Sequence, residues 1–242
     1  MVRSGQRFDD LSERATGWEF AWLDGRHVSS EPSWSYPEMA RGLIRRAVGL
    51  LDLDTGSGEL LAELAPLPPH TVAVESWTRN VAVARDRLGP FNVPVLTELP
   101  GGEDEFDVVL SRHGRLPAAD IARLLRRGGR VLTQQVGSDD LAAVNTSLKA
   151  PPAYPRRWNA DVAANALREA GLRVTGVREE RPAVTFHDVG AVVRQLRDLP
   201  WQIRDFSPER YSDALGRLDS FIRLHGGFTV TAHRFLVEAV RP

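Results

Sequence analysis

The stretch from Leu50 to Leu61, LLDLDTGSGELL, constrains the fold of this chain more than any other. An apolar run at residues 48–53 is typical of a short buried strand, and turn-forming residues follow at 54–58. Good helix formers continue the stretch at residues 59–64. A strand, a glycine turn and a helix in this order place backbone N–H groups at the carboxyl edge of a parallel sheet. The stretch predicts a ligand-binding turn, although an ordinary strand-to-helix turn can show the same pattern.

A second apolar run, from His70 to Glu75, predicts a strand that ends in an acid. Glu75 lies 17 residues after Gly58. An acid about 20 residues beyond a glycine turn suits a pair of ribose hydroxyls, and one carboxylate can accept hydrogen bonds from both. The spacing therefore favours a nucleoside-containing ligand, while a solvated glutamate at a strand end is the alternative.

The rest of the chain continues as alternating strands and helices, which predicts an α/β fold around a mostly parallel sheet. A helix from Pro37 leads into the first strand, and the final strand is expected at Phe228–Val240. Between them we expect strands at 93–96, at 107–111 and at 130–136, and a further strand that ends at about residue 178. We expect helices at 77–88, 118–127 and 159–170. A last helix is expected to begin at Pro208, with Ser207 as its N-cap.

Several of these segments resemble the class I S-adenosylmethionine-dependent methyltransferases. The first motif of that family is matched by residues 52–59, DLDTGSGE, and its fourth and fifth strands resemble residues 106–114 and 124–137. The resemblance implies a Rossmann-like sheet of seven strands, mostly parallel, with the last strand antiparallel between the fifth and sixth. It also implies helices on both faces and a small helical cap. A narrower likeness, to a group of bacterial methyltransferase-like proteins, spans nearly the whole chain.

The same resemblance implies S-adenosyl-L-methionine as cofactor and S-adenosyl-L-homocysteine as product. Glu75 matches the acid that the family places on the ribose, Trp77 follows where a ring can lie against the adenine, and Thr97 or Glu98 occupies the loop used around that ring. The expected cofactor-binding residues are Asp52, Asp54, Thr55, Gly56, Ser57, Gly58, Glu75, Ser76, Trp77, Thr97, Glu98, Ser111 and Arg112.

Asp54 departs from the family pattern, because it stands where the first glycine of the motif is expected. Aspartate tolerates unusual backbone angles better than most residues, so the turn can still form. Its carboxylate could meet the ammonium group of the cofactor or repel the carboxylate. The affinity for the cofactor is therefore a separate question from the fold.

Two histidines are the candidate catalytic residues. His113 follows the predicted fourth strand. In the family that this chain resembles, the residues at this position face the sulfonium methyl, and an imidazole can act there as a base or as an orienting donor. It could equally hydrogen-bond the loop backbone. His187 precedes Asp188 and could form an acid–base pair with it, although sequence neighbours often point apart. The expected substrate-contacting residues are Trp22, Trp34, His113, Phe186 and Trp201.

We expect three parts in the chain. Residues 1–36 are rich in tryptophan and could close over the site as a lid, or simply pack against the body. Residues 37–242 form the methyltransferase domain. Within it, residues 182–226 look like a helical cap inserted before the last strand.

Composition limits the functions that fit. The formal net charge is −1, so no overall field draws the protein to nucleic acid. The chain has no cysteine, which excludes disulfides, a thiolate nucleophile and a cysteine-bound zinc, and no metal site is expected. Neither a membrane-spanning apolar run nor the apolar core of a signal peptide is visible. We expect a cytoplasmic monomer or homodimer.

These observations predict a methyltransferase that acts on a small-molecule acceptor by direct in-line transfer from the sulfonium. An RNA-modifying methyltransferase and a cofactor-binding protein of the same fold without transfer activity are the alternatives. A nicotinamide-dependent enzyme also remains open.

Overall fold

The computed structural model describes residues 25–242 of the chain. These residues divide into two units. The sheet unit consists of residues 33–137, 158–180 and 234–242. The small unit consists of residues 138–157 and 181–233, together with the described residues 25–32. Most of the predicted lid, including Trp22, lies outside the described residues.

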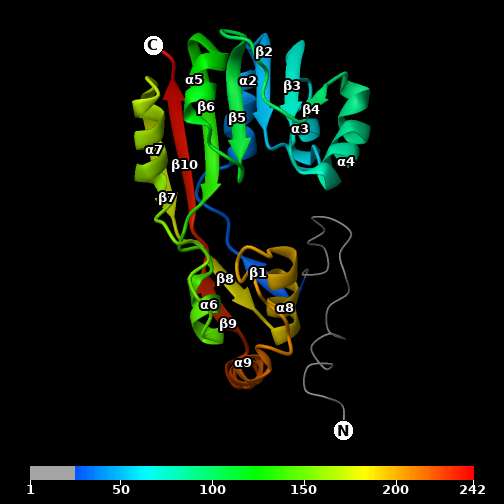
Figure 1. Cartoon of the computed structure of the whole chain (residues 1–242), viewed down its shortest axis with the longest axis vertical. Helices are drawn as coiled ribbons and strands as arrows, with labels where there is room; N and C mark the ends of the chain where they lie inside the picture. The colour runs from blue at the N-terminus through cyan, green and yellow to red at the C-terminus, as the bar shows by residue number, and fades with distance from the viewer. Residues whose placement is uncertain (1–24) are drawn as a thin grey trace. The chain divides into compact units, whose positions relative to one another are not determined.

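The sheet unit is built on seven strands in the order β4-β3-β2-β5-β6-β10-β7 (Figure 1). Only β10 is antiparallel, and it lies between β6 and β7. This order confirms the predicted fold class, with its single antiparallel strand between the fifth and sixth parallel strands. The strands are β2 (Gly49–Leu53), β3 (His70–Val74), β4 (Val95–Leu96), β5 (Phe106–Arg112), β6 (Leu125–Val136), β7 (Arg173–Glu180) and β10 (Arg234–Val240).

Helices cover both faces of this sheet, because the inner strands alternate side chains between two apolar cores. Leu50 of β2 packs in one core with α2, α3 and α4, whereas Leu51 packs in the other with α5 and α7. Every residue of β2 is buried. The helices are α2 (Tyr36–Ile44), α3 (Glu59–Glu63), α4 (Thr78–Leu88), the short 3₁₀ helix η2 (Gly89–Phe91), α5 (Ala118–Leu124) and α7 (Ala160–Glu169).

Local capping explains where two of these helices begin and end. Asn159 caps α7 by accepting a hydrogen bond from the backbone N–H of Val162, and Gly171 follows the helix with a φ of 87°. Ser35 caps α2 in the same way, and Pro37 occupies its first turn. The predicted limits of α7 are therefore confirmed.

The small unit has a core and a sheet of its own. Its strands β1 (His27–Ser29), β8 (Ala183–Phe186) and β9 (Phe228–Thr231) form an antiparallel sheet in the order β1-β8-β9. Its helices are α6 (Ala142–Leu148), α8 (Val189–Asp198) and α9 (Ser212–His225). The predicted helical cap, residues 182–226, lies within this unit, which also contains the three-stranded sheet and α6.

Four local predictions were wrong. The helix expected at 118–127 ends at Leu124, and residues 125–127 belong to β6. The expected final strand, Phe228–Val240, is two strands in two different sheets, because the N–H groups of residues 232 and 233 bond to Pro182 and Asp140 rather than to a neighbouring strand. The expected loop at 137–158 contains α6. Ser207 caps only a turn, by accepting from the N–H of Arg210, and α9 starts later, at Ser212.

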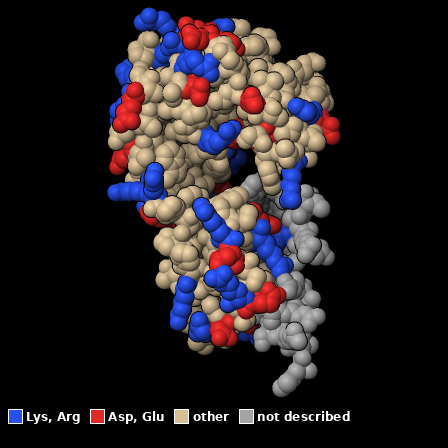
Figure 2. All heavy atoms as spheres, viewed as in Figure 1, with Lys and Arg blue, Asp and Glu red and all other residues tan. Residues whose placement is uncertain are grey.

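The surface carries charges of both signs. On the face shown in Figure 2, Lys and Arg side chains are interspersed with Asp and Glu. Within residues 25–242, no helix combines the length and the apolar character needed to cross a membrane. No group of three or more His, Asp and Glu side chains in that range could hold a metal ion.

Candidate cofactor site

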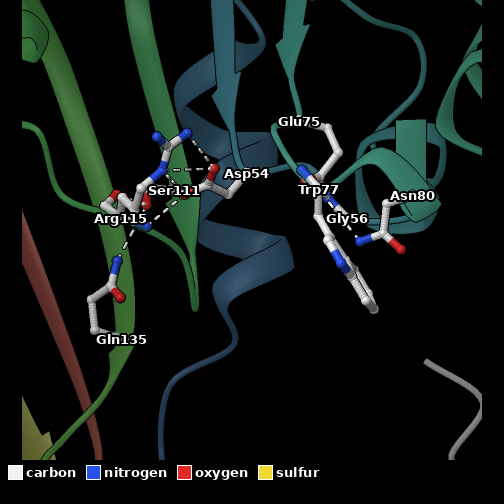
Figure 3. Close-up of polar contacts among 8 residues, drawn as sticks. All are labelled: Asp54, Gly56, Glu75, Trp77, Asn80, Ser111, Arg115 and Gln135. Atoms are coloured by element: carbon white, nitrogen blue, oxygen red, sulfur yellow. Dashed lines mark hydrogen bonds and ion pairs between the residues drawn. The ribbon is translucent and has the colours of Figure 1, made fainter. Parts of the chain in front are cut away.

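The candidate site forms where three parallel strands end at the same level. Leu53, at the end of β2, pairs with Val74 of β3 and with Ser111 of β5. The segments that follow these strands therefore meet at one edge of the sheet, where ligands bind in open α/β folds. They are the turn 54–58, the segment from Glu75 to Asn80 and the loop 112–115 (Figure 3).

The turn after β2 is held in a left-handed conformation. Asp54, Gly56 and Gly58 have φ values of 51°, 65° and 74°. A Cβ on Gly58 would lie 2.9 Å from Cγ of Leu88, so this glycine is required for helix packing. A Cβ on Gly56 would meet no atom within 4 Å, so there is open space beside the turn. The two glycines therefore have different roles, one in packing and one in allowing a close approach to the backbone.

Glu75 lies at the centre of this edge. Its carboxylate accepts hydrogen bonds from the backbone N–H of Gly56 at 2.8 Å, from that of Trp77 at 2.7 Å and from the side-chain amide of Asn80 at 3.4 Å (Figure 3). The residue is only 4% exposed. These donors fix the carboxylate against the glycine turn. Since an ionised carboxylate has about four acceptor positions, it can still receive a hydroxyl donor.

Asp54 makes a second polar cluster, on the other side of the turn (Figure 3). Its carboxylate accepts from the backbone N–H of Arg115 at 2.6 Å and forms an ion pair with Nη2 of the same residue at 2.9 Å. Gly114 makes this approach possible, because a Cβ there would lie 2.6 Å from Asp54. The residue that departs from the family pattern thus joins the turn after β2 to the loop after β5.

Asp52 is buried beneath both clusters. Desolvation, opposed by a hydrogen bond from the Thr55 hydroxyl and assisted by the negative charges of Asp54 and Glu75, raises the pKa of its carboxyl group to about 7. The Thr55 hydroxyl oxygen is itself buried, beside this carboxyl group.

The predicted adenine contacts are exposed. Trp77 is 42% exposed, and the guanidinium of Arg79 lies over its ring at 5.8 Å. Ser76, Thr97 and Glu98 are exposed as well. Ser57 differs, because its hydroxyl accepts a hydrogen bond from Arg87 at 2.7 Å.

Ser111 and Arg112 end β5, but only Arg112 reaches solvent. The Ser111 hydroxyl is buried, where it accepts from Gln135 and donates to the backbone carbonyl of Arg115. Its hydroxyl therefore supports the loop after β5 and is not free to contact a cofactor. Sequence reasoning had assigned it to the ligand surface.

His113 follows β5 with a φ of 59°. Its backbone N–H donates to the carbonyl of Gln134 at 2.7 Å, and its Nε2 lies 3.0 Å from Nε2 of the Gln134 side chain. Oε1 of Gln134 accepts from the indole N–H of Trp34 at 2.7 Å. Although His113 keeps exposed surface, desolvation lowers its pKa, and the positive charges of Arg112 and Arg234 lower it further.

Several predicted substrate contacts are structural residues instead. Trp34 is 6% exposed and belongs to the core of the sheet unit, and Phe186 is fully buried in the core of the small unit. Trp201, also in the small unit, is 40% exposed, which agrees with a surface role but does not test it. Trp22 lies outside the described residues.

The predicted pair of His187 and Asp188 does not form. Asp188 caps α8 by accepting from the N–H of Ala191, and its carboxylate pairs with Arg26, with an oxygen 2.8 Å from Nε. Nδ1 of His187 lies 3.3 Å from the carbonyl oxygen of Gly226 instead. Helix capping therefore explains the aspartate, and the histidine has no acid partner in this pair.

Two residues of the site were missed at the level of sequence. Asn80 contacts Glu75 from the first turn of α4, and Arg115 pairs with Asp54. The sequence shows that Arg115 follows the fourth strand, but it does not show that Asp54 is the partner of this arginine. Nothing in the sequence distinguishes Asn80 from an ordinary helix residue.

Comparison with known proteins gives a fold-level result. No protein-family model and no functionally curated protein matches the sequence. Among solved structures, a proposed methyltransferase from Bacillus halodurans is 18% identical, with a TM-score of 0.56 over 85% of this chain and 97% of that one. The [4+2]-cyclase SpnF is 15% identical, with a TM-score of 0.55 over 99% of this chain and 96% of that one.

A third similar structure contains S-adenosylhomocysteine. It is a phosphoethanolamine N-methyltransferase from Haemonchus contortus in complex with S-adenosylhomocysteine. It is 16% identical to this chain, with a TM-score of 0.51 over 85% of this chain and 52% of its own length. Strand order, the glycine turn and these similarities agree: the chain has the fold of the class I S-adenosylmethionine-dependent methyltransferases.

Proposed function

We propose that this protein is an S-adenosylmethionine-dependent methyltransferase that acts on a small molecule. The observation that carries the proposal is the buried carboxylate of Glu75, held by backbone N–H groups beside an open glycine turn. A carboxylate that is already oriented loses little entropy when it accepts hydrogen bonds from a ribose. The fold alone would not support a nucleoside ligand as strongly, since one fold carries many functions.

The residues present fit the cofactor. Glu75 would accept from a ribose hydroxyl, Trp77 would stack on the adenine, and the turn at Gly56 would allow close approach of the ligand. When bound, the cofactor supplies a methyl group on a sulfonium, which already contains its leaving group. The chain itself would therefore contribute mainly position and exclusion of water.

A small acceptor agrees with the charge distribution better than RNA does. The formal net charge is −1, and the visible face in Figure 2 mixes both signs. Nucleic-acid-binding proteins concentrate positive charge on one face. An RNA substrate would show itself as salt-dependent binding to RNA in a gel-shift experiment.

A cofactor-binding protein with different chemistry is the second candidate, because the similar cyclase SpnF is named for a reaction other than methyl transfer. The two candidates differ in turnover. Saturable cofactor binding together with transfer of a labelled methyl group to a metabolite pool would support a methyltransferase. Binding without transfer to any pool would support the second candidate.

Isothermal titration calorimetry with S-adenosylhomocysteine tests the part that both candidates share. We expect saturable binding, lost in Glu75→Ala and retained in Asp86→Ala, which removes an exposed acid from α4 of the same unit. Absence of binding at about millimolar ligand, a concentration that detects interactions of only about 4 kcal/mol, would remove the proposal.

A further inference from the structure

The contacts of His113 fix the position of its proton. The indole nitrogen of Trp34 can only donate, so the atom of Gln134 that lies 2.7 Å from it must be the amide oxygen. The amide nitrogen of Gln134 then points to Nε2 of His113 at 3.0 Å and donates to it. Nε2 must therefore carry a lone pair and no hydrogen.

The other protonation states all place two donors against each other. A proton on Nε2, either in the other neutral tautomer or in the imidazolium, would face the amide N–H of Gln134. Rotating the amide would relieve that contact, but it would turn its NH₂ group toward the indole N–H of Trp34. Both Trp34 and Gln134 are 6% exposed, so water cannot easily replace a lost partner. A buried unpaired donor costs about 1–3 kcal/mol.

The surroundings favour the same state. The charged groups that face His113 are Arg112 of β5 and Arg234 of β10, and both are positive. The neighbouring residue on β6 is the neutral Gln134, and the backbone N–H of His113 is bonded to the carbonyl of that same residue. Both the backbone N–H and the imidazole ring of His113 are therefore held against β6.

We propose that Gln134 and Trp34 position His113 as a permanently neutral hydrogen-bond donor, with its proton on Nδ1. No residue in the described part of the chain hydrogen-bonds to Nδ1, and the side chain keeps exposed surface. Nδ1–H is therefore available to a ligand, while the only other ring nitrogen is occupied.

This inference rests on the proposed function where it concerns the substrate. A histidine without a free lone pair cannot remove a proton from a methyl acceptor, so it is an orienting residue and not a general base. The acceptor that fits it presents an oxygen, such as a carbonyl or carboxylate, to Nδ1–H. Its nucleophilic atom must attack without help from this histidine.

Nitrogen NMR of the full chain labelled at histidine tests the proposal without any ligand. The resonance of His113 is identified by its loss in His113→Asn. We expect one neutral form with the proton on Nδ1 from about pH 5 to about pH 8, whereas an ordinary exposed histidine titrates within that range. An Nε2–H form, or titration of His113 near pH 6.5, would overturn the proposal.

Two variants test whether Gln134 and Trp34 fix the proton of His113 on Nδ1. Gln134→Glu replaces the donor with an acceptor, so a proton should appear on Nε2. Asn92→Asp is the control, because it adds the same charge at an exposed position of the same unit and should leave the Nδ1–H form unchanged. Trp34→Phe removes the donor that orients the amide, and a mixture of tautomers should follow. An unchanged His113 spectrum in both Gln134→Glu and Trp34→Phe would contradict the assignment.

The outcomes separate this inference from the proposed function. The NMR result depends only on the contacts of His113, and calorimetry with S-adenosylhomocysteine depends on the cofactor site. A chain that binds the ligand but shows an Nε2–H form of His113 would keep the function and lose this inference. The reverse pair of results would keep the histidine assignment and remove the methyltransferase.

Discussion

Glu75 and Asp54 are two carboxylates at the ends of neighbouring strands, but the protein satisfies them in different ways (Figure 3). Glu75 is 4% exposed and is held mainly by backbone N–H groups. Asp54 is held by one backbone N–H and by Arg115, whose side chain is 62% exposed. Backbone donors cannot move without moving the turn, whereas an exposed side chain can leave at little cost. We therefore infer that Glu75 is a fixed part of the site and that the Asp54 ion pair is exchangeable.

Glu75→Ala should have the largest effect on ligand binding. It removes the acceptor proposed for the ribose and leaves the N–H groups of Gly56 and Trp77 without their partner. We expect binding of S-adenosylhomocysteine to weaken at least about 100-fold, or about 3 kcal/mol, and the free energy of unfolding to fall by about 2 kcal/mol. Calorimetry measures the change in affinity, and urea denaturation measures the change in the free energy of unfolding. Unchanged affinity would show that Glu75 is only structural.

Asp52→Asn should change how stability depends on pH. The folded pKa of about 7 lies above the ordinary value of 3.8, so the unfolded chain ionises first as the pH rises. Asp52 therefore lowers the free energy of unfolding progressively between about pH 4 and pH 7, by at most about 4 kcal/mol. In urea denaturation, the variant and the natural protein should have the same free energy of unfolding at low pH, and the variant should have the higher value at pH 8. Equal slopes for both proteins would contradict the raised pKa.

Alanine at the two glycines beside Glu75 should affect different properties, mainly stability at Gly58 and mainly ligand binding at Gly56. Gly58→Ala combines a left-handed backbone with a Cβ that lies 2.9 Å from Leu88, so we expect about 2–3 kcal/mol of lost stability. Gly56→Ala meets no protein atom and should cost only about 1 kcal/mol in stability. Its added methyl group would enter the ligand space, so binding of S-adenosylhomocysteine should weaken about tenfold, or about 1.4 kcal/mol. Equal binding by Gly56→Ala and the natural protein would place the ligand elsewhere.

Arg115→Gln should have the smallest effect. The arginine side chain is 62% exposed, and exposed ion pairs contribute less than about 1 kcal/mol. The free energy of unfolding should therefore match that of Arg127→Gln, which removes an exposed charge elsewhere in the sheet unit. A loss of more than about 2 kcal/mol, well above the range for exposed pairs, would show that the Asp54 cluster is as fixed as the Glu75 cluster.

The sheet was predictable because its signals are local. Each inner strand is a short apolar run bounded by turn formers or polar residues, and β2 and β5 were recognised with errors of only a residue or two at their ends. The antiparallel β10 came from the resemblance to a known family. Its lower limit was wrong because the chain from Phe228 to Val240 contains no glycine or proline to mark a break, while tertiary hydrogen bonds at residues 232 and 233 divide it between two sheets.

The site was predictable only where spacing along the chain decides position. Glu75 and the glycine turn lie on adjacent strands, so their meeting follows from the parallel pairing of β2 with β3. Trp34 and Phe186 were assigned to the substrate because aromatic residues suit both a binding surface and a core. Burial separates these two roles, and burial depends on which elements pack together.

By itself, the sequence determined the order of strands and helices in the sheet unit, the glycine turn and the acid that follows it, because these depend on neighbours along the chain. Only the tertiary structure decided which polar groups meet across strands. It paired Asp54 with Arg115, and it aligned Trp34, Gln134 and His113 so that one protonation state of the histidine satisfies every donor. Hydrogen bonds require the right atoms within about 3 Å, and no pattern of residues along a chain specifies such distances between segments that are far apart in it.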